Sequence, residues 1–286
     1  MKTKQNIFVF CTWYLVALSL CFAGCEVIRE EDRLIPVSVS EGCMRTHVLI
    51  EYTGFRCVNC PKAEETAQEL QTLYGDRLVV VAMHPASNPF TQGAYDYTCP
   101  EADEVYLFMD GEEDTPFPTG NIDMQSQEDG YFSDQSEWPT LLSRALTDTI
   151  CPYLTPEVTT VDTVRRTVHL TAYAYSTALT DCRMAVWLTE DSIIGPQAMP
   201  DGTAEMEYCH RHVLRAAQDG QPFGSPVTLS QEMKRFELTM TYPEDCNPAH
   251  CHLVTLLLDN NNYHILQAYE TQMAPIGSDD ALCPTR

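Results

Sequence analysis

The sequence is poor in basic residues, and this deficit excludes one large class of partners. Only 17 of its 286 residues are Lys or Arg, against 41 Asp or Glu, so the formal net charge is -24. The first 24 residues contain two lysines and no acidic residue, so a chain without them carries -26. Such a field repels phosphate backbones, and it excludes nucleic acid as a partner.

Several catalytic and binding motifs are also missing. The sequence has no glycine-rich phosphate loop, and no serine lies in a nucleophile-elbow pattern, which disfavours nucleotide-binding proteins and hydrolases. It has one Cys-x-x-Cys motif, Cys57 to Cys60, and no second one to complete a four-cysteine zinc site. We therefore expect neither a metal nor a cofactor.

Only one long apolar run is present, and it lies at the start of the chain. It extends from Ile7 to Ala23 after a basic start, and it is shorter than the ~20 residues of a membrane-spanning helix. Residues 1–24 are thus predicted to form a secretory signal. The end of this run resembles a bacterial lipobox, in which Cys25 would carry lipid and residues 25–42 would form a lipidated tether. The alternative is an ordinary signal peptide with a spare cysteine.

The next 110 residues or so have the pattern of an α/β domain. Thr46–Tyr52 is predicted to be a strand, and Cys57–Leu73 a helix with an apolar stripe that ends at Gly75. Arg77–Met83 is a continuous β-branched run, typical of a buried parallel strand. A strand, helix and strand of this size predict a βαβ unit.

After about Pro156 the pattern changes to short alternating strands with Pro, Gly and Asn between them. This change predicts an antiparallel, Ig-like β-sandwich at residues 156–275, followed by a C-terminal tail at 276–286. "CPYLTPE", Cys151 to Glu157, is the predicted linker. The strands are predicted within these segments: Thr163–Tyr175, Met184–Thr189, Phe236–Tyr242, Leu253–Leu258 and Tyr263–Tyr269.

The Cys-x-x-Cys motif lies where a helix is predicted to begin. The free amides and dipole of the first turn favour a thiolate at Cys57, and Cys60, one turn later, is placed to resolve a mixed disulfide. In a βαβ unit of an exported chain this context resembles thioredoxin. The resemblance implies a thioredoxin-like domain at residues 43–152, and hence an α/β domain followed by an all-β domain.

The same resemblance assigns two more residues to the site. Glu51 precedes Cys57 by six positions, where thioredoxins carry a buried carboxylate that helps to move the proton of the resolving thiol. Phe117-Pro118-Thr119 resembles the cis-proline turn that faces the dithiol, so Pro118 would shape a peptide-binding edge. Arg56 and Asn59 depart from the Trp and Pro usual in thioredoxins, so neither the redox potential nor the partner can be carried over. A static disulfide and half of a zinc site remain alternatives.

The other cysteines and the histidines suggest structure more than chemistry. Without the signal segment, Cys25 and the dithiol, eight cysteines remain, and an even number in an oxidising compartment favours disulfides. They permit 105 pairings, among which we expect Cys43 with Cys99 or Cys151, and Cys246 with Cys251. Metal binding by the segments "YCHRHVLR" and "CNPAHCHL" is the weaker alternative, because their potential ligands are nearly 40 residues apart.

Three segments carry a resemblance to a known family. "HVLIEYTGFRCVNCPKAEE", "VWLTEDSIIGPQ" and "YCHRHVLR" together resemble the outer membrane protein 28-related family of Bacteroidetes. The resemblance implies a cell-envelope lipoprotein, held in the outer membrane by an N-terminal lipid and facing either the periplasm or the cell surface. The acidic cluster Arg29–Asp32 also resembles the signal that routes some Bacteroidetes lipoproteins to the surface.

Two functions remain open. The first is a thiol-disulfide oxidoreductase that exchanges with envelope proteins: Cys57 attacks, Cys60 resolves, Glu51 assists proton transfer and Pro118 shapes the binding edge. The second is a non-enzymatic surface protein that binds an extracellular ligand or another envelope protein. In that case the thioredoxin-like domain is a scaffold and the disulfide a structural staple.

Overall fold

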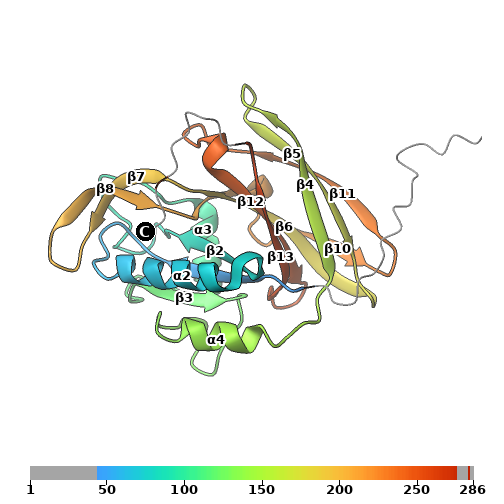
Figure 1. Ribbon diagram of the computed structural model, residues 1–286, viewed down its shortest axis with the longest axis horizontal. Helices are drawn as coiled ribbons and strands as arrows, with labels where there is room; N and C mark the ends of the chain where they lie inside the picture. Colours follow the sequence, from blue (N-terminus) through green and yellow to red (C-terminus); the bar gives the residue numbers. More distant parts are fainter. Residues whose placement is uncertain (1–43, 276–282, 284–286) are drawn as a thin grey trace, which may run out of the picture. The chain divides into compact units, whose positions relative to one another are not determined.

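The computed structural model of the chain describes residues 44–275 and Cys283 (Figure 1). The predicted signal segment, the proposed lipid site Cys25, the tether and most of the C-terminal tail lie outside the described residues. Within the described part, no helix is both long and apolar enough to cross a membrane.

The predicted strand–helix–strand unit is confirmed. Strand β1 (His47–Tyr52) and strand β2 (Leu78–Met83) pair in parallel, and helix α2 (Cys60–Tyr74) lies between them in the chain. Gly75 ends the helix with a φ of 54°, a left-handed conformation that glycine adopts without steric cost, and begins the 3-10 helix η2 (Gly75–Arg77). Every residue of both strands is buried, as their apolar runs predict.

Three further elements complete the first part of the chain. Helix α3 (Pro100–Phe108) follows β2, strand β3 (Thr119–Ile122) pairs antiparallel with β1, and helix α4 (Trp138–Ala145) comes next. Proline lies at the start of all three helices, α2, α3 and α4, where its missing N–H costs no hydrogen bond.

The second part is almost entirely β, and each of the five predicted strands has a counterpart. The predicted linker is corrected, because residues from Tyr153 onward pair with β5 and the Tyr153 ring stacks on Tyr175. The structure adds β4, β7, β8, β9 and β10 to the prediction. The elements are β4 (Tyr153–Asp162), β5 (Thr167–Tyr175), β6 (Thr180–Glu190), β7 (Ile193–Ala198), β8 (Ala204–His210), β9 (Val213–Ala217), η3 (Gln218–Gly220), β10 (Ser225–Leu229), β11 (Lys234–Thr241), η4 (Pro248–His250), β12 (Cys251–Asp259) and β13 (Ile265–Gln272).

One sheet runs through both parts of the chain. Its strand order is β13-β12-β6-β9-β2-β1-β3, with β10 also beside β6. The two parts join where Ala82 of β2 pairs with Val213 of β9, and Ala82 N–H donates to His212 O at 2.8 Å. The described chain is therefore mostly β, with several sheets. The domain boundaries given above stay a prediction.

The two faces of this sheet are covered by different elements. At its β6–β12 end, the separate sheet β11-β5-β4 packs on one face, and Leu170 of β5 and Leu188 of β6 belong to the same hydrophobic core. At its β1–β2 end, α2 and α4 cover that face with Ala67 and Trp138. Alternate residues of the strands point to the other face and pack with α3, in a core that also contains Cys57 and Cys60.

Candidate functional site around the dithiol

Cys57 and Cys60 form a disulfide at the first turn of α2. The loop that carries Cys57 leaves the carboxyl end of β1 and turns at once, since Cys57 N–H donates to Gly54 O at 2.9 Å. Gly54 is required here, because a Cβ at this position would lie 2.5 Å from the carbonyl oxygen of Phe90. The two sulfur-bearing residues are exposed by only 1% and 2%, so the disulfide is covered.

The Arg56 guanidinium contacts the main chain of residues 89–92. Its Nη1 lies 3.2 Å from the carbonyl oxygen of Gln92 and 3.4 Å from that of Pro89. The side chain therefore holds the loop to residues 89–92.

Pro118 lies beside the start of α2, across a surface groove. The Phe117–Pro118 peptide bond is cis, which confirms the turn that the sequence predicts. The groove encloses about 640 Å³, and Asn59 and Lys62 from the dithiol side line it together with Pro118. Phe117 packs in the same hydrophobic core as Cys57. The two segments that the resemblance brings together are thus neighbours in space.

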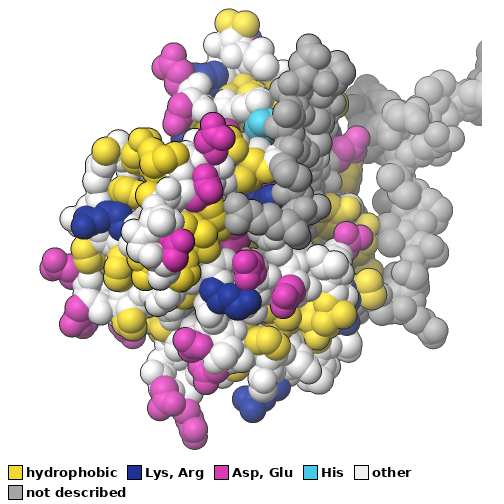
Figure 2. Space-filling model, turned by 60° about the vertical axis from the view of Figure 1, so that its left-hand side comes forward, with side chains coloured by type: hydrophobic (Ala, Val, Ile, Leu, Met, Phe, Trp, Pro, Cys, Tyr) yellow, Lys and Arg dark blue, Asp and Glu magenta, His cyan; other side chains and the backbone are white. Residues whose placement is uncertain are grey.

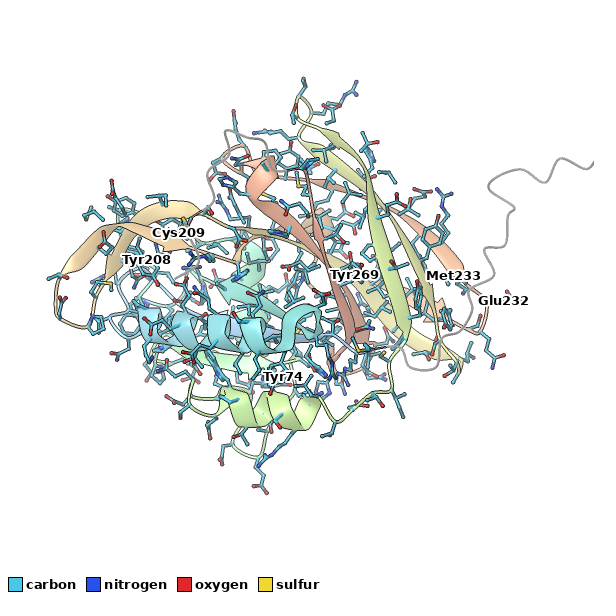
Figure 3. All side chains as sticks on the ribbon, in the orientation of Figure 1. Tyr74, Tyr208, Cys209, Glu232, Met233 and Tyr269 are labelled. Carbon is cyan, nitrogen blue, oxygen red and sulfur yellow. A yellow bond between two sulfur atoms is a disulfide. The ribbon has the colours of Figure 1, made fainter. Side chains whose placement is uncertain are left out.

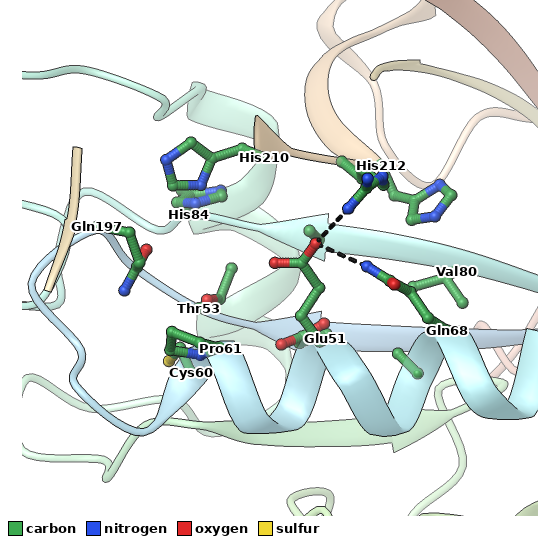
Figure 4. A pocket seen from close by; sticks show the side chains of 14 residues that line it. Glu51, Thr53, Cys60, Pro61, Gln68, Val80, His84, Gln197, His210 and His212 are labelled. Carbon is green, nitrogen blue, oxygen red and sulfur yellow. Dashed lines mark hydrogen bonds and ion pairs between the residues drawn. The ribbon is translucent and has the colours of Figure 1, made fainter. Parts of the chain in front are cut away.

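Glu51 lies behind the dithiol in a small cavity of about 20 Å³, which has room for roughly one water molecule. Cys60 and Gln197 line the same cavity (Figure 4). The carboxyl group is buried, and its Oε1 has no hydrogen-bond partner among the described residues. Burial, and then the charge of nearby Glu64, raise the pKa of Glu51 well above its ordinary value.

Two buried histidines that sequence reasoning did not assign to the dithiol also line this cavity. Burial lowers the pKa of His84, at the end of β2, to about 3, and His210 and Arg215 nearby contribute to this shift. Burial likewise lowers the pKa of His210, on β8, to about 4. Neither ring nitrogen of His84 has a partner among the described residues. Both imidazoles are therefore neutral at physiological pH.

Gln197 is the third residue that the sequence analysis did not single out. Its buried amide Nε2 donates to Cys57 O at 2.8 Å, from a strand 140 residues away in the chain. Gln197 is the last residue of "VWLTEDSIIGPQ", a segment that carries part of the family resemblance. Nothing in that segment alone indicates contact with the dithiol.

The described cysteines outside the dithiol include one pair that was not among the expected ones, while the expected pairing of Cys43 with Cys151 stays a prediction. Cys209 is bonded to Cys283. Cys99 is a buried thiol whose Sγ donates to Leu214 O, so it does not pair with Cys43, which lies outside the described residues. Burial raises the pKa of the Cys99 thiol to about 12.

Cys246 and Cys251 are adjacent buried thiols. Their sulfur atoms and a carboxylate oxygen of Glu190 lie within 4.8 Å of one another, which is the spacing of metal ligands. Both oxygens of Glu190 already have partners, however: the backbone N–H of Asn247 donates to one at 2.7 Å, and Arg215 Nη1 donates to the other at 2.5 Å. The guanidinium supplies the positive charge there, so the group does not fit a cation. The structure therefore has two thiols here in place of the predicted Cys246–Cys251 disulfide.

The chain matches one protein family, and its fold is similar to those of solved structures. A family model described as outer membrane protein Omp28 matches residues 113–276. The structure of HBP35 of Porphyromonas gingivalis is similar, with a TM-score of 0.64 and 13% identity over 86% of this chain and 82% of that one. A protein of Agrobacterium tumefaciens has a TM-score of 0.51 and 12% identity over 85% of this chain and 99% of its own. At such identities these two likenesses show the fold alone. No curated protein matches the chain.

Proposed function

Because the chain belongs to the Omp28 family and is a protein of the outer membrane, we propose that it is an envelope lipoprotein whose Cys57–Cys60 pair exchanges thiols and disulfides with other envelope proteins. The family match confirms the predicted location in the outer membrane. The position of the pair supports the proposal. It lies at the first turn of α2, beside a surface groove. Behind it lies Glu51, whose Oε1 has no hydrogen-bond partner among the described residues.

We also infer a thioredoxin-like architecture for the part of the chain before β4. Parallel strands β1 and β2, the helix α2 between them and the antiparallel strand β3 support this inference. In this arrangement Cys57 is the attacking thiol, Cys60 the resolving thiol and Glu51 the proton donor, while Pro118 borders the groove that takes an extended client segment.

A redox titration of the Cys57–Cys60 pair tests the proposal. Alkylation of the free thiols at each potential, followed by mass spectrometry, gives the fraction reduced. We expect a value between about -270 and -120 mV, the range of working oxidoreductases. A value below about -300 mV belongs to a structural disulfide and would contradict the proposal.

Trapping of a client gives a second test in cells. Cys60→Ser removes the resolving thiol, so a mixed disulfide between Cys57 and a client should accumulate and appear as a larger species on non-reducing gels. Cys57→Ser should abolish it. Cys99→Ser is the matched control, since it removes a buried thiol outside the pair. If cells that carry Cys60→Ser hold no larger species, exchange with envelope proteins is not the function.

A non-enzymatic binding protein is the second candidate, and the burial of both sulfur-bearing residues favours it. In that case the disulfide is a staple and the β-rich part contacts a ligand or another envelope protein. A Cys57→Ser/Cys60→Ser double variant would then bind as the wild type does, and the protein would be open to protease on intact cells. Sandwich folds serve many functions, so the fold alone does not choose between the candidates.

The lipid anchor is proposed at Cys25. Cys25→Ala should move the protein from the membrane fraction to the soluble fraction, because the acyl chains attached there would be its hold on the bilayer. Cys21→Ala, four residues earlier, is the control and should leave the protein in the membrane fraction. Retention of Cys25→Ala in the membrane would favour an ordinary signal peptide and another means of attachment.

A further inference from the structure

The hairpin of β7 and β8 lies over the loop that carries Cys57. Among the described strands, β7 and β8 pair only with each other, and they form a sheet separate from the other two (Figure 1). A two-stranded ribbon by itself is at best marginally stable in water. The position of this hairpin therefore depends on its contacts with the rest of the molecule.

Two residues at the end of β7 hold the hairpin to the dithiol loop. The backbone N–H of Ala198 donates to Phe55 O at 2.8 Å. The Gln197 amide Nε2 donates to Cys57 O at 2.8 Å and lies 3.4 Å from Gly54 O. All of these acceptors are carbonyl oxygens of residues 54–57, so the hairpin binds the main chain of the loop.

The base of the hairpin is anchored in a different way. Cys209 lies near the end of β8 (Figure 3) and is covalently bonded to Cys283. Cys283 N–H donates to Ser192 Oγ, just before β7. In addition, Tyr208 and Arg211 bind the carboxylate of Glu64 on α2. Both strands of the hairpin are thus fixed at its base.

The far end of the hairpin, beyond the contacts of Gln197 and Ala198, is exposed. Residues 200–207 are all exposed, and Met206 keeps 57% of its surface. Figure 2, which brings the hairpin side of the molecule forward, shows hydrophobic side chains gathered on this face. Because the base is fixed and the tip is exposed, breaking only the contacts of Gln197 and Ala198 would let this end of the hairpin swing away from the loop.

We propose that the β7–β8 hairpin is a hinged cover of the Cys57–Cys60 disulfide, and that a thiol reaches the sulfur atoms only after Gln197 and Ala198 leave the loop. This inference rests on the proposed function, because a cover has a role only if the pair reacts with a protein client. With the cover open, a client thiolate attacks Cys57 Sγ and forms a mixed disulfide.

In this first step the Cys57–Cys60 bond breaks, and Cys60 leaves with the electron pair and takes up a proton. A second thiolate of the same client then attacks the client sulfur and displaces Cys57, so the client is oxidised and the pair is reduced.

Tyr97 provides a way to displace the cover without touching the dithiol. A Cβ at Gly195 of β7 would lie 1.7 Å from the Tyr97 hydroxyl oxygen and 3.0 Å from the ring carbon that bears it. Gly195→Ala should therefore push the hairpin outward. Adding Tyr97→Phe removes the hydroxyl group and should let the hairpin return.

The measurement is the rate at which a small phosphine or dithiothreitol reduces Cys57–Cys60 in the full chain, followed by alkylation and mass spectrometry of these two residues. We expect Gly195→Ala to be reduced about tenfold faster than the wild type, the factor for losing one or two hydrogen bonds of the closed state. The Gly195→Ala/Tyr97→Phe variant should return to near the wild-type rate.

Gln197→Ala tests the same cover by removing its side-chain hydrogen bond, and it guards against misfolding of the glycine variant. Its matched control is Gln231→Ala, which removes an amide that donates to Thr177 O at 3.0 Å elsewhere. The first should be reduced faster and the second at the wild-type rate. If Gly195→Ala and Gln197→Ala both react at the wild-type rate, the hairpin is not a cover.

This test separates the cover from the proposed function. Small reductants need no client, so faster reduction of the variants upholds the cover even if Cys60→Ser traps nothing in cells. Trapping of a client by Cys60→Ser, with no change of rate in the hairpin variants, upholds exchange and overturns the cover.

Discussion

Asp123→Ala should lower the free energy of unfolding by about 3–5 kcal/mol, the range for removing one member of a buried ion pair. The Asp123 side chain is fully buried and its carboxylate accepts three hydrogen bonds. The donors are Val48 N–H at 2.8 Å, His47 Nδ1 at 2.6 Å and Arg45 Nη2 at 3.2 Å. Without the carboxylate, Val48 N–H and His47 Nδ1 lose their partner, and the nearly buried Arg45 guanidinium keeps only the more exposed carboxylate of Asp148 and the carbonyl oxygen of Ile265.

The backbone of the same residue joins strands from distant parts of the chain. Asp123 N–H donates to Val48 O of β1 at 2.9 Å, and Asp123 O accepts from Ile265 N–H of β13 at 2.9 Å. Arg45 Nη2 also donates to Ile265 O at 2.6 Å. Because the contacts of Asp123 connect the two parts of the chain, Asp123→Ala should destabilise both parts.

The control for this variant is Asp110→Ala. Asp110 has the same left-handed backbone as Asp123, with φ values of 61° and 57°, but it is exposed. It therefore measures the cost of alanine in this conformation, about 1–2 kcal/mol, without the buried partners. Urea unfolding followed by tryptophan fluorescence compares the two. Equal losses in both variants would show that the buried pair adds nothing to stability.

The sequence predicted the elements that have a strong local signal. The β-branched run before Met83 and the stripe that ends at Gly75 were enough to place β2 and α2 within a few residues. Alternation placed β5 and β11, whereas β6 and β12 were recognised as apolar runs and are buried on both faces. The Cys57–Cys60 motif could be recognised because both thiols lie within four consecutive residues.

The missed elements have signals that are weak or lie far apart in the chain. β7 contains Gly195 and Pro196, two residue types that are depleted inside strands. β8 does alternate from Ala204 to Tyr208, but its polar positions are the glutamates Glu205 and Glu207, which have low strand propensity. Their contact with the dithiol loop depends on tertiary packing across 140 residues. The Cys209–Cys283 bond was one of many equivalent pairings, and no spacing rule could have selected it.

Glu51→Gln should change the pH dependence of stability. Because burial raises the pKa of Glu51 above the value of about 4.3 in an unfolded chain, the folded state holds a proton that the unfolded state has lost. This contribution to stability is fully present below the unfolded pKa and is lost as the pH rises through the folded pKa. At a pH above both pKa values, each unit by which the folded pKa exceeds the unfolded pKa lowers the free energy of unfolding by about 1.4 kcal/mol. Glutamine cannot ionise, so its curve should lack this decline.

Glu51→Gln should also slow disulfide exchange by about 10² or more, the usual contribution of a positioned acid or base. The leaving Cys60 thiolate needs a proton, and the buried acid lines the same cavity as Cys60. Glu69→Gln, on the exposed face of α2, is the control for both measurements. A stability curve that changes while exchange continues at the wild-type rate would mean that Glu51 does not supply the proton to Cys60. A loss of rate together with the altered curve would identify one protonated carboxyl group as the source of both effects.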